Sequence, residues 1–588
     1  MTDTKQSRLT ATLLCVTPPD EHQEQGIRAF LQKKYGEDVA LTIQQDSSLK
    51  SGFQLHVGSE VYDWSAKGRM EQFRQQVEQL VAKNTRKDII PLLRSSIDEF
   101  RLLAKSSEVG TVKSIGDGIA VVEGLEHAAY GEILMFDNGI KGMVQDLRRN
   151  ETGCILFDNA DDISAGSKVA RTGKTAGVPV GDAFLGRVVD ALGRPIDGGD
   201  AIPADGYRPV EEPAPGIIDR QSVDTPMETG LLSIDAMFPI GRGQRELIIG
   251  DRQTGKTAIA LDAMLNQKGK NVICVYVAIG QKASSVAQLV ENLRKRDAMD
   301  YCVVVSATAG EADTMQYIAP YAGCAMAEYY MHKGRDVLIV YDDLSKHAIA
   351  YRAMSLLLER APGREAYPGD VFYLHSRLLE RSAHLSDKLG GGSMTALPIV
   401  ETQAGDVSAY IPTNIISITD GQIFLESDLF FAGQRPAVNV GLSVSRVGGV
   451  AQTKATKKAT GSLRLDLAQY REMEVFTQFS SDLDDSTKEQ LHYGQGLMRI
   501  LRQKQYHPLS MHQQVIVLVC AMGHVLSKVA VKDVTDFRDA LLDHFEQEHS
   551  DLCRSLEDEK VLTDDMKQEI LRIAEEYLAA NAERFRKE

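Results

Sequence analysis

Hydrophobic and polar positions divide the chain into segments of different period. Residues 8–82 combine short alternating strands with a helix whose apolar positions recur at helical spacing. From Val109 onward, short strands separated by glycine turns predict a small β-barrel. Residues 178–455 alternate continuous apolar strands with helical segments, which predicts a sheet covered on both faces. From residue 456 to the end the pattern is helical.

These segments predict a multidomain fold, because single hydrophobic cores rarely grow beyond roughly 250–300 residues and this chain has 588. The expected parts are an α+β module at 1–82, a linker and helix at 83–107, a β-barrel at 108–177, an α/β P-loop (RecA-like) nucleotide-binding domain at 178–455, and a C-terminal α-helical domain at 456–588. Helices are expected over 65–82, 88–104 and 563–588. Val515–Cys520 is apolar on all sides, so it fits a buried strand or a buried helix, and its helical surroundings favour the helix.

The individual strands follow from short apolar or alternating runs. In the first module they are expected at Thr10–Val16, Asp38–Ile43, Phe53–Val57 and Val61–Asp63. In the barrel they are expected at Thr111–Lys113, Gly118–Val122, Glu132–Phe136 and Gly142–Val144. In the nucleotide domain they are expected at Arg245–Ile249, Val272–Ala278, Cys302–Val305 and Val337–Tyr341.

The most informative stretch lies between the strand Arg245–Ile249 and a helix. It fits the phosphate-binding pattern G-x-x-x-x-G-K-[ST] at every fixed position: Gly250, Asp251, Arg252, Gln253, Thr254, Gly255, Lys256 and Thr257. Glycines let backbone N–H groups point at phosphate oxygens, and the helix N-terminus adds a favourable dipole. Lys256 is expected to reach the β- and γ-phosphates of a nucleotide, and the Thr257 hydroxyl to ligate Mg²⁺.

A second acidic residue for Mg²⁺ is expected at the end of a neighbouring strand. The strand Val337–Tyr341 runs directly into Asp342 and Asp343. Asp342 is first after the apolar run, so we assign it to the metal. Asp343 is better placed to cap the next helix.

Hydrolysis also requires a group that orients or activates water, and the turn after the strand Val272–Ala278 is its natural place. That turn is Gly280-Gln281-Lys282 and offers no carboxylate. An amide can hydrogen-bond water but cannot take its proton, so the site should bind ATP better than it turns ATP over. Small GTPases do orient water with a glutamine, however, and a plain surface amide is an equally good interpretation of Gln281.

A further candidate is Arg446, at the end of the run Pro436–Arg446 (PAVNVGLSVSR). A guanidinium there could act in trans on the γ-phosphate of a neighbouring subunit. Taken alone, this arginine would be read as a surface ion-pair partner.

Composition narrows the classes of function. The formal charge of −16 disfavours nucleic acid as a main partner, because phosphate backbones select basic surfaces. The seven cysteines are scattered without a C-x-x-C pair, which predicts reduced core thiols instead of disulfides or a zinc site. The N-terminus has no apolar signal-peptide core. The most apolar run, Val515–Leu526, is shorter than the roughly 20 residues that span a bilayer, so any membrane association is expected to be indirect.

Together these motifs resemble the α subunit of F-type ATP synthases over about residues 86–588. The runs that carry the resemblance are Gly250–Thr257 (GDRQTGKT), Val277–Gln288 (VAIGQKASSVAQ), Tyr341–Lys346 (YDDLSK), Pro362–Leu374 (PGREAYPGDVFYL) and Pro436–Arg446. The family's catalytic β subunits carry a glutamate in a G-E-R turn where this chain has Gln281, so the resemblance is to the non-catalytic partner.

The resemblance implies a subunit of an ion-translocating ATP synthase that alternates with β in a hexamer around γ. It implies Mg-ATP at a regulatory, non-exchanging site, with little or no turnover by the chain alone. Arg446 would be the arginine finger for the adjacent β site. Gln253, Arg435, Pro436, Gln503 and Gln505 would border the adenine. The complex would lie peripherally on the cytoplasmic face of a bacterial plasma membrane.

The N-terminal segment of the chain does not follow the pattern of this family. The runs Ser48–Ser65 (SLKSGFQLHVGSEVYDWS) and Gly68–Gln72 (GRMEQ) resemble the C-terminal domain of the δ subunit, which ties the catalytic ring to the peripheral stalk. A δ–α fusion is therefore expected, with the b subunit of the stalk as partner. The helical N-terminal domain of δ is expected to be absent from this chain, so its role would fall to another chain or be lost.

Two other functions remain open from the residues. A self-sufficient P-loop motor, of the secretion type or a ring helicase, is disfavoured by Gln281 and, for the helicase, by the acidic charge. A pure assembly protein without nucleotide binding is disfavoured by the intact Gly255-Lys256-Thr257 and by Asp342. The residues leave proton or sodium coupling, and net synthesis or hydrolysis, undecided.

Overall fold

The computed structural model describes residues 10–19, 21–35, 39–46, 49, 51–58, 60–65, 106–137, 139–158, 163–477 and 485–585. The helices expected over 65–82 and 88–104 lie outside these residues, except for Ser65. The chain forms two compact units, one made of residues 1–176 with 357–359 and the other of 177–356 with 360–588. Each unit has its own sheet and its own core.

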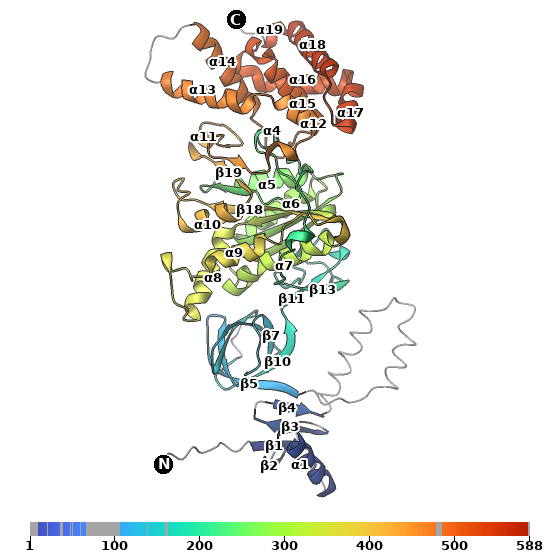
Figure 1. The fold of residues 1–588 in the computed structure, drawn as a ribbon, viewed down its shortest axis with the longest axis vertical. Coiled ribbons are helices and arrows are strands. Elements are labelled where there is room, and N and C mark those ends of the chain that lie inside the picture. Colours follow the sequence, from blue (N-terminus) through green and yellow to red (C-terminus); the bar gives the residue numbers. More distant parts are fainter. Residues whose placement is uncertain are drawn as a thin grey trace, which may run out of the picture. The chain divides into compact units, whose positions relative to one another are not determined.

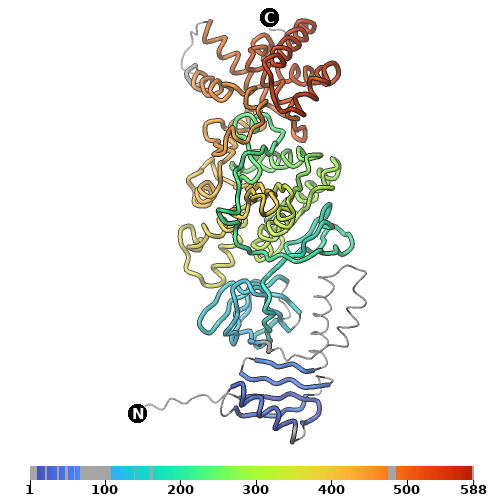
Figure 2. Tube along the Cα trace, turned by 45° about the vertical axis from the view of Figure 1, so that its right-hand side comes forward, coloured from blue at the N-terminus to red at the C-terminus, as the bar shows by residue number. Residues whose placement is uncertain are grey.

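The first unit begins with a small α+β module (blue in Figures 1 and 2). Its elements are β1 (Thr10–Cys15), α1 (Glu21–Tyr35), β2 (Ala40–Gln45), β3 (Phe53–Val57) and β4 (Glu60–Asp63). β1 and β2 are parallel, as the intervening helix requires, whereas β3 is antiparallel to both β1 and β4. The four expected strands are confirmed within two residues at each end.

A β-barrel follows in the same unit. Its strands are β5 (Ser106–Gly116), β6 (Ile119–Glu123), β7 (Glu132–Phe136), β8 (Lys141–Leu147), β9 (Glu151–Leu156) and β10 (Lys168–Thr175). They pair in the order β5-β6-β9-β8-β7-β10, and β10 returns to β5, which closes the barrel. The first residues of β5 also pair with β4, so β5 belongs to both sheets. The sequence interpretation named no strand for β9 or β10.

The second unit is built on an eight-stranded sheet in the order β12-β16-β15-β17-β18-β14-β19-β20, with helices on both faces (Figure 1). Its strands are β12 (Val188–Val189), β14 (Leu247–Gly250), β15 (Val272–Gln281), β16 (Cys302–Thr308), β17 (Asp336–Asp342), β18 (Ser393–Glu401), β19 (Gly421–Leu425) and β20 (Val444–Ser445). All neighbours are parallel except β19 and β20. A separate pair joins β11 (Gly177–Val180) to β13 (Gly206–Pro209).

The helices of this domain connect the strands. They are α4 (Leu232–Met237), α5 (Lys256–Leu265), α6 (Ala283–Arg294), α7 (Asp313–Met331), α8 (Leu344–Leu357), α9 (Val371–Leu379), α10 (Tyr410–Ile418) and α11 (Ser427–Phe431). The four strands expected here are confirmed, but β14 starts at Leu247, and Arg245 and Glu246 precede it.

The carboxyl-terminal part is helical. Its helices are α12 (Lys454–Thr460), α13 (Leu463–Thr477), α14 (Asp485–Ile500), α15 (Met511–Met522), α16 (Val534–Glu548), α17 (Ser550–Glu559), α18 (Asp564–Ala580) and α19 (Ala582–Phe585). The prediction of a buried helix at Val515–Cys520 is confirmed by α15, whereas the tail expected as one helix is divided at Asn581. No helix among the described residues has both the length and the apolarity to cross a membrane.

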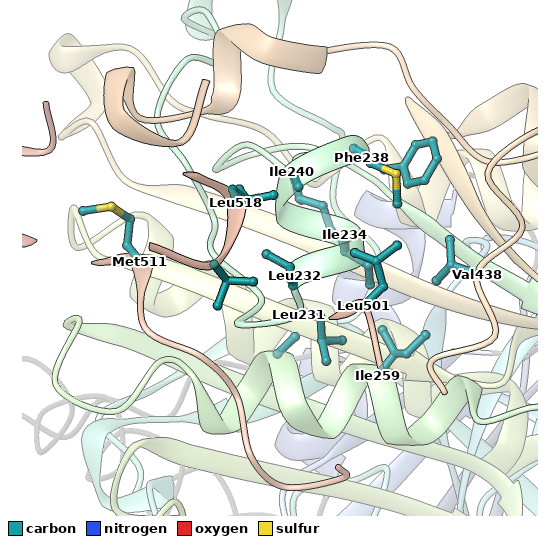
Figure 3. Close-up of a cluster of buried hydrophobic side chains, with 14 of the residues drawn as sticks. Leu231, Leu232, Ile234, Phe238, Ile240, Ile259, Val438, Leu501, Met511 and Leu518 are labelled. Atoms are coloured by element: carbon teal, nitrogen blue, oxygen red, sulfur yellow. The ribbon is translucent and has the colours of Figure 1, made fainter. Parts of the chain in front are cut away.

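One hydrophobic core connects the nucleotide domain with this helical part. Figure 3 shows Leu232 and Ile234 of α4 and Ile259 of α5 gathered with Leu501 and Leu518 from the helical part. All five side chains are at most 4% exposed. The segment after α14 is therefore held against α5, the helix that follows the phosphate-binding turn.

Candidate functional site

The phosphate-binding turn joins β14, the sixth of the eight strands in the sheet, to α5. Gly255 is the N-cap of α5 and has φ of 96°, a left-handed conformation that favours glycine. Lys256 is 7% exposed, and its ammonium donates hydrogen bonds to the carbonyl oxygens of Gly250, at 2.9 Å, and Asp251. Burial lowers the pKa of this lysine. The turn thus holds a buried cation at a helix N-terminus, which is an anion-binding arrangement.

The other side chains of the turn brace it or face solvent. Asp251 accepts hydrogen bonds from Thr402 Oγ1, at 2.6 Å, and from Ser427 Oγ, at 3.0 Å. Thr254 Oγ1 donates to the Asp251 carbonyl at 2.8 Å. Arg252 is exposed, and its Nε lies 2.9 Å from Glu401 Oε2. Gln253 has φ of 63°.

The two residues assigned to Mg²⁺ meet directly. Thr257 Oγ1 donates to Asp342 Oδ2 at 2.8 Å, and the Tyr276 hydroxyl donates to the same oxygen. Asp342 is 4% exposed and is the last residue of β17, which is separated from β14 by β18. A hydroxyl and a carboxylate side by side are the oxygen ligands that Mg²⁺ takes in P-loop sites.

Asp343 caps the following helix, as the sequence predicts. Its Oδ1 accepts the Lys346 N–H at 2.9 Å, at the start of α8. Burial raises the pKa of Asp343 to about 6, against the opposing effect of the Lys346 ammonium 3.2 Å away. Asp343 is therefore engaged with α8 and leaves Asp342 as the carboxylate that faces Thr257.

Gln281, the last residue of β15, lies beside Asp342. Its Nε2 donates to Asp342 Oδ1 at 2.9 Å. The preceding Gly280 has φ of 59°, and a Cβ there would lie 2.7 Å from Gln316 Oε1. The end of β15 therefore presents an amide, which cannot accept a proton from water, next to the Asp342 carboxylate.

Of the five residues assigned to the adenine pocket, Gln253 lies in the phosphate-binding turn, and the other four occupy two neighbouring segments. The backbone N–H of Gln503 donates to the Arg435 carbonyl at 2.9 Å, and Pro436 follows Arg435. The side chain of Gln503 bonds to the backbone of Leu232 and Gly230, at 2.7 and 2.8 Å, so it braces α4. Arg435 and Gln505 are exposed.

Arg446 lies near the amino-terminal end of β19, whereas the phosphate-binding turn lies at the carboxyl-terminal end of that strand. The turn starts at Gly250, which is paired with Leu425 at the carboxyl end of β19. Arg446 follows β20, and its N–H donates to Asp420, just before β19 begins. The two levels, Leu425 and Asp420, are five residues apart along the chain, or about 16 Å at roughly 3.3 Å per residue. Arg446 is exposed and, among the described residues, its guanidinium makes no hydrogen bond or ion pair.

Three residues near the site were missed by sequence reasoning. Tyr276 interrupts the apolar run of β15, and a buried tyrosine hydroxyl needs a partner, which here is Asp342. Asp262 interrupts the apolar face of α5, and its Oδ1 accepts the Tyr506 N–H at 2.8 Å. Phe430 has no sequence signal, yet its ring lies under the Arg435 guanidinium and 3.7 Å from a Cβ built at Gly255.

A separate candidate site is an apolar cavity of about 800 Å³ in the first module. It lies between α1 and the sheet, and the only tryptophan of the chain, Trp64, lines it. The apolar side chains around it are Leu13, Cys15, Val16, Pro18, Pro19, Ile27, Phe30, Phe53 and Leu55.

Comparison with known families matches four stretches of the chain. The ATP synthase alpha/beta family matches in three pieces: its beta-barrel domain at residues 105–173, its nucleotide-binding domain at 230–445 and its C terminal domain at 452–577. The ATP synthase delta (OSCP) subunit family matches residues 1–77.

Close relatives are named ATP synthase subunit alpha. One from Clostridium botulinum (strain Hall) is 58% identical over 483 residues, which cover 82% of this chain and 96% of the relative. One from Clostridium kluyveri (strain NBRC 12016) is 56% identical over 490 residues, which cover 83% of this chain and 97% of the relative. The chain therefore belongs to the ATP synthase alpha subunit family, with a module of the delta (OSCP) family joined to its front.

Proposed function

We propose that this subunit binds Mg-ATP without turning it over. The observation that carries the proposal is the hydrogen bond from Gln281 to Asp342, because it puts an amide where a general base is needed. Lys256 and the backbone of Gly250–Thr257 would hold the phosphates, and Thr257 with Asp342 would hold Mg²⁺. The adenine would lie beside Gln253, Arg435, Pro436, Gln503 and Gln505, next to the Phe430 ring.

Binding of Mg-ATP by the full chain tests this assignment. Lys256→Gln should weaken binding at least tenfold, because it removes the cation that the turn encloses. Thr257→Val should reduce the dependence on Mg²⁺, because it removes the proposed metal ligand. Lys268→Gln is the matched control, since Lys268 is exposed and pairs with Asp297 on the surface. Equal affinities for all four proteins would contradict the assignment.

We further propose that Arg446 acts on the catalytic site of an adjacent β subunit. The support is its exposure and its position at the opposite end of β19 from the turn of its own chain. A guanidinium attached about 16 Å along the strand direction from its own phosphate site is better placed to serve a neighbour. The subunits would alternate in a hexamer around γ, and the complex would lie peripherally on the cytoplasmic face of the membrane, where it would couple ion transport to ATP.

For the first module we propose contact with the b subunit of the peripheral stalk. The support is the match to the delta (OSCP) family and the apolar cavity between α1 and the sheet, which could take apolar side chains of that partner. Trp64 is the only tryptophan and lines this cavity, so its fluorescence reports occupancy directly.

Addition of the b subunit to the full chain should therefore shift the fluorescence of Trp64. Phe53→Ser should weaken the binding of b, whereas Arg28→Gln is the control, because Arg28 pairs with Glu24 on the surface of α1. Removal of residues 1–82 should abolish co-purification with b. Unchanged capture of b by the shortened chain would contradict the proposed contact with the peripheral stalk. It would leave the proposal of Mg-ATP binding unaffected.

A further inference from the structure

Three helices of the carboxyl-terminal part bring a nitrogen, a sulfur and an oxygen donor together, far from the nucleotide site in the sequence. His512 lies in the first turn of α15, Glu546 in the last turn of α16, and Cys553 in α17. One ligand atom from each lies within 4.8 Å of the other two. We propose that His512, Glu546 and Cys553 form a binding site for a thiophilic divalent cation, with Zn²⁺ as the best fit.

The orientation of the imidazole supports this proposal. Glu557 Oε2 lies 2.9 Å from His512 Nδ1 and also accepts the His512 backbone N–H at 3.1 Å. The other ring nitrogen, Nε2, lies 2.7 Å from Glu546 Oε1. A carboxylate on one ring nitrogen fixes the imidazole so that the other can ligate a metal, as in the carboxylate–histidine pairs of zinc sites. Glu557 is thus a positioning residue.

The local scaffold holds the donors from several directions. Ser510 and Gln513 form a capping box at the start of α15, so the backbone that carries His512 is fixed. Gln513 Nε2 also donates to Glu546 Oε1 at 3.1 Å. Cys553 is 3% exposed, whereas the Glu546 side chain is 44% exposed. The site therefore has a buried sulfur at its base and a side open to solvent, through which a cation and a water ligand can enter.

The chemical types of the three donor atoms determine which metal the site prefers. Thiolate, imidazole and carboxylate together suit Zn²⁺, whereas Mg²⁺ and Ca²⁺ prefer oxygen ligands alone. In a tetrahedral zinc site the donor atoms lie roughly 3.3–3.8 Å apart. The donor spacing now runs from 2.7 Å between His512 Nε2 and Glu546 Oε1 up to at most 4.8 Å within the group. Side-chain rotation that moves the Cys553 and Glu546 ligand atoms by about 1 Å brings this spacing to the tetrahedral range. Binding releases the Cys553 thiol proton and any proton on His512 Nε2 to solvent.

A bound cation would cross-link α15, α16 and α17. These helices pack into the core that also holds α5, because Phe545 of α16 and Leu556 of α17 belong to the same cluster as Ile259. A metal would thus stabilise the part of the chain that carries Gln503 and Gln505. Neither turnover nor Mg²⁺ enters this inference, which stands independently of the proposed nucleotide function.

The test uses the full chain after treatment with a chelator, titrated with Co²⁺ as a spectroscopic probe and then with Zn²⁺. We expect one equivalent of Co²⁺ to produce a thiolate-to-metal charge-transfer band together with the visible bands of a tetrahedral ion, and Zn²⁺ to displace it. Zn²⁺ should also raise the thermal unfolding midpoint of the helical part.

Cys553→Ser should eliminate the charge-transfer band, and Glu557→Gln should weaken affinity by about 10- to 100-fold without moving the band. Cys520→Ala is the matched control, because Cys520 is also buried but lies within α15 outside the cluster. The control should bind as the parent does. Absence of a one-to-one complex in the parent, or a charge-transfer band that survives Cys553→Ser, overturns the proposal. His512 is then an imidazole bracketed by two glutamates and nothing more.

Discussion

At the scale of single residues, the hydrogen bond between Gln281 and Asp342 has a testable electrostatic consequence. Gln281→Glu replaces the amide donor, 2.9 Å from Asp342 Oδ1, with a second carboxylate. Two carboxylates at this distance repel each other, so we expect a loss of on the order of 1–2 kcal/mol in the stability of the nucleotide domain. Mg-ATP should restore most of this loss, because a divalent cation neutralises the pair.

The thermal midpoint with and without Mg-ATP measures this effect. Gln281→Leu is the control, since it removes the same donor without adding a charge. Mg-ATP should therefore raise the thermal midpoint of Gln281→Leu by the same amount as that of the parent. If the two substitutions responded alike to Mg-ATP, the account of this contact would be wrong.

Asp262 gives a pH-dependent prediction. Burial raises its pKa from 3.8 to about 6 in the folded chain, although the Tyr506 N–H and Arg296 act in the opposite direction. The folded state therefore binds this proton more tightly than the unfolded state. Ionisation of Asp262 lowers the stability of the folded chain by up to about 3 kcal/mol. This penalty is fully present above about pH 6 and disappears as the pH falls towards 3.8.

Asp262→Asn should consequently raise the thermal midpoint of the nucleotide-free chain more at pH 8 than at pH 5. Asparagine keeps the oxygen that accepts the Tyr506 N–H, so the hydrogen bond survives. Asp543→Asn on the exposed surface of α16 is the control and should show no such difference. A gain of equal size at both pH values would contradict the assignment of the penalty to ionisation.

Sequence reasoning placed the residues that belong to a fixed motif. Lys256 and Thr257 follow from the spacing of the turn, and Asp342 follows from its place after an apolar strand, which puts it beside Thr257. Phe430 could not be placed in this way, because its approach to Gly255 depends on how β19 and α11 pack against the turn. Such contacts between distant segments leave no periodic trace in the sequence.

At the scale of elements, the packing of α7 on β15 depends on a missing side chain. A Cβ at Gly323 would lie 2.4 Å from a methyl group of Val277. Gly323→Ala should therefore destabilise the sheet by about 1–3 kcal/mol, through overpacking. Gly323→Ala combined with Val277→Ala should recover part of the loss, and thermal denaturation of the three proteins provides the measurement. A single substitution without effect would show that the helix moves away freely.

Gly26 in α1, unlike Gly323, has open space where a side chain would lie. Nothing lies within 4 Å of a Cβ at this position, and the residue is inside a helix. Gly26→Ala should stabilise α1 by up to about 1 kcal/mol, because alanine loses less backbone entropy in a helix. Slower amide hydrogen exchange in α1 is the expected result, and faster exchange would indicate that α1 is not a helix in solution.

The elements that the sequence predicted well have a strong period or a long apolar run. β15, β16 and β17 are continuous apolar strands, and their burial on both faces explains the pattern. β9 and β10 were missed because polar residues and glycine interrupt their alternation, and barrel closure supplies their partners instead. The break at Asn581 was missed because the amphipathic pattern continues across it from α18 into α19.

At the scale of the whole molecule, the fusion sets the number of stalk modules. If this subunit alternates with β in a hexamer, the ring holds three copies of it and so three delta (OSCP) modules. Native mass spectrometry of the purified complex should find three full-length chains and no separately encoded copy of the module. Chains that lack residues 1–82 in the assembled ring would contradict this expectation.

The most direct test of the account is the rate of ATP hydrolysis by this chain alone, by the chain with its β subunit, and by the Arg446→Ala chain with β. The account predicts bound nucleotide but little turnover by the chain alone, activity once β is added, and a loss of about 10³-fold or more with Arg446→Ala. Nucleotide bound to the chain itself should be unaffected by that substitution. Steady hydrolysis by the isolated chain, or full activity of the Arg446→Ala complex, would contradict the account.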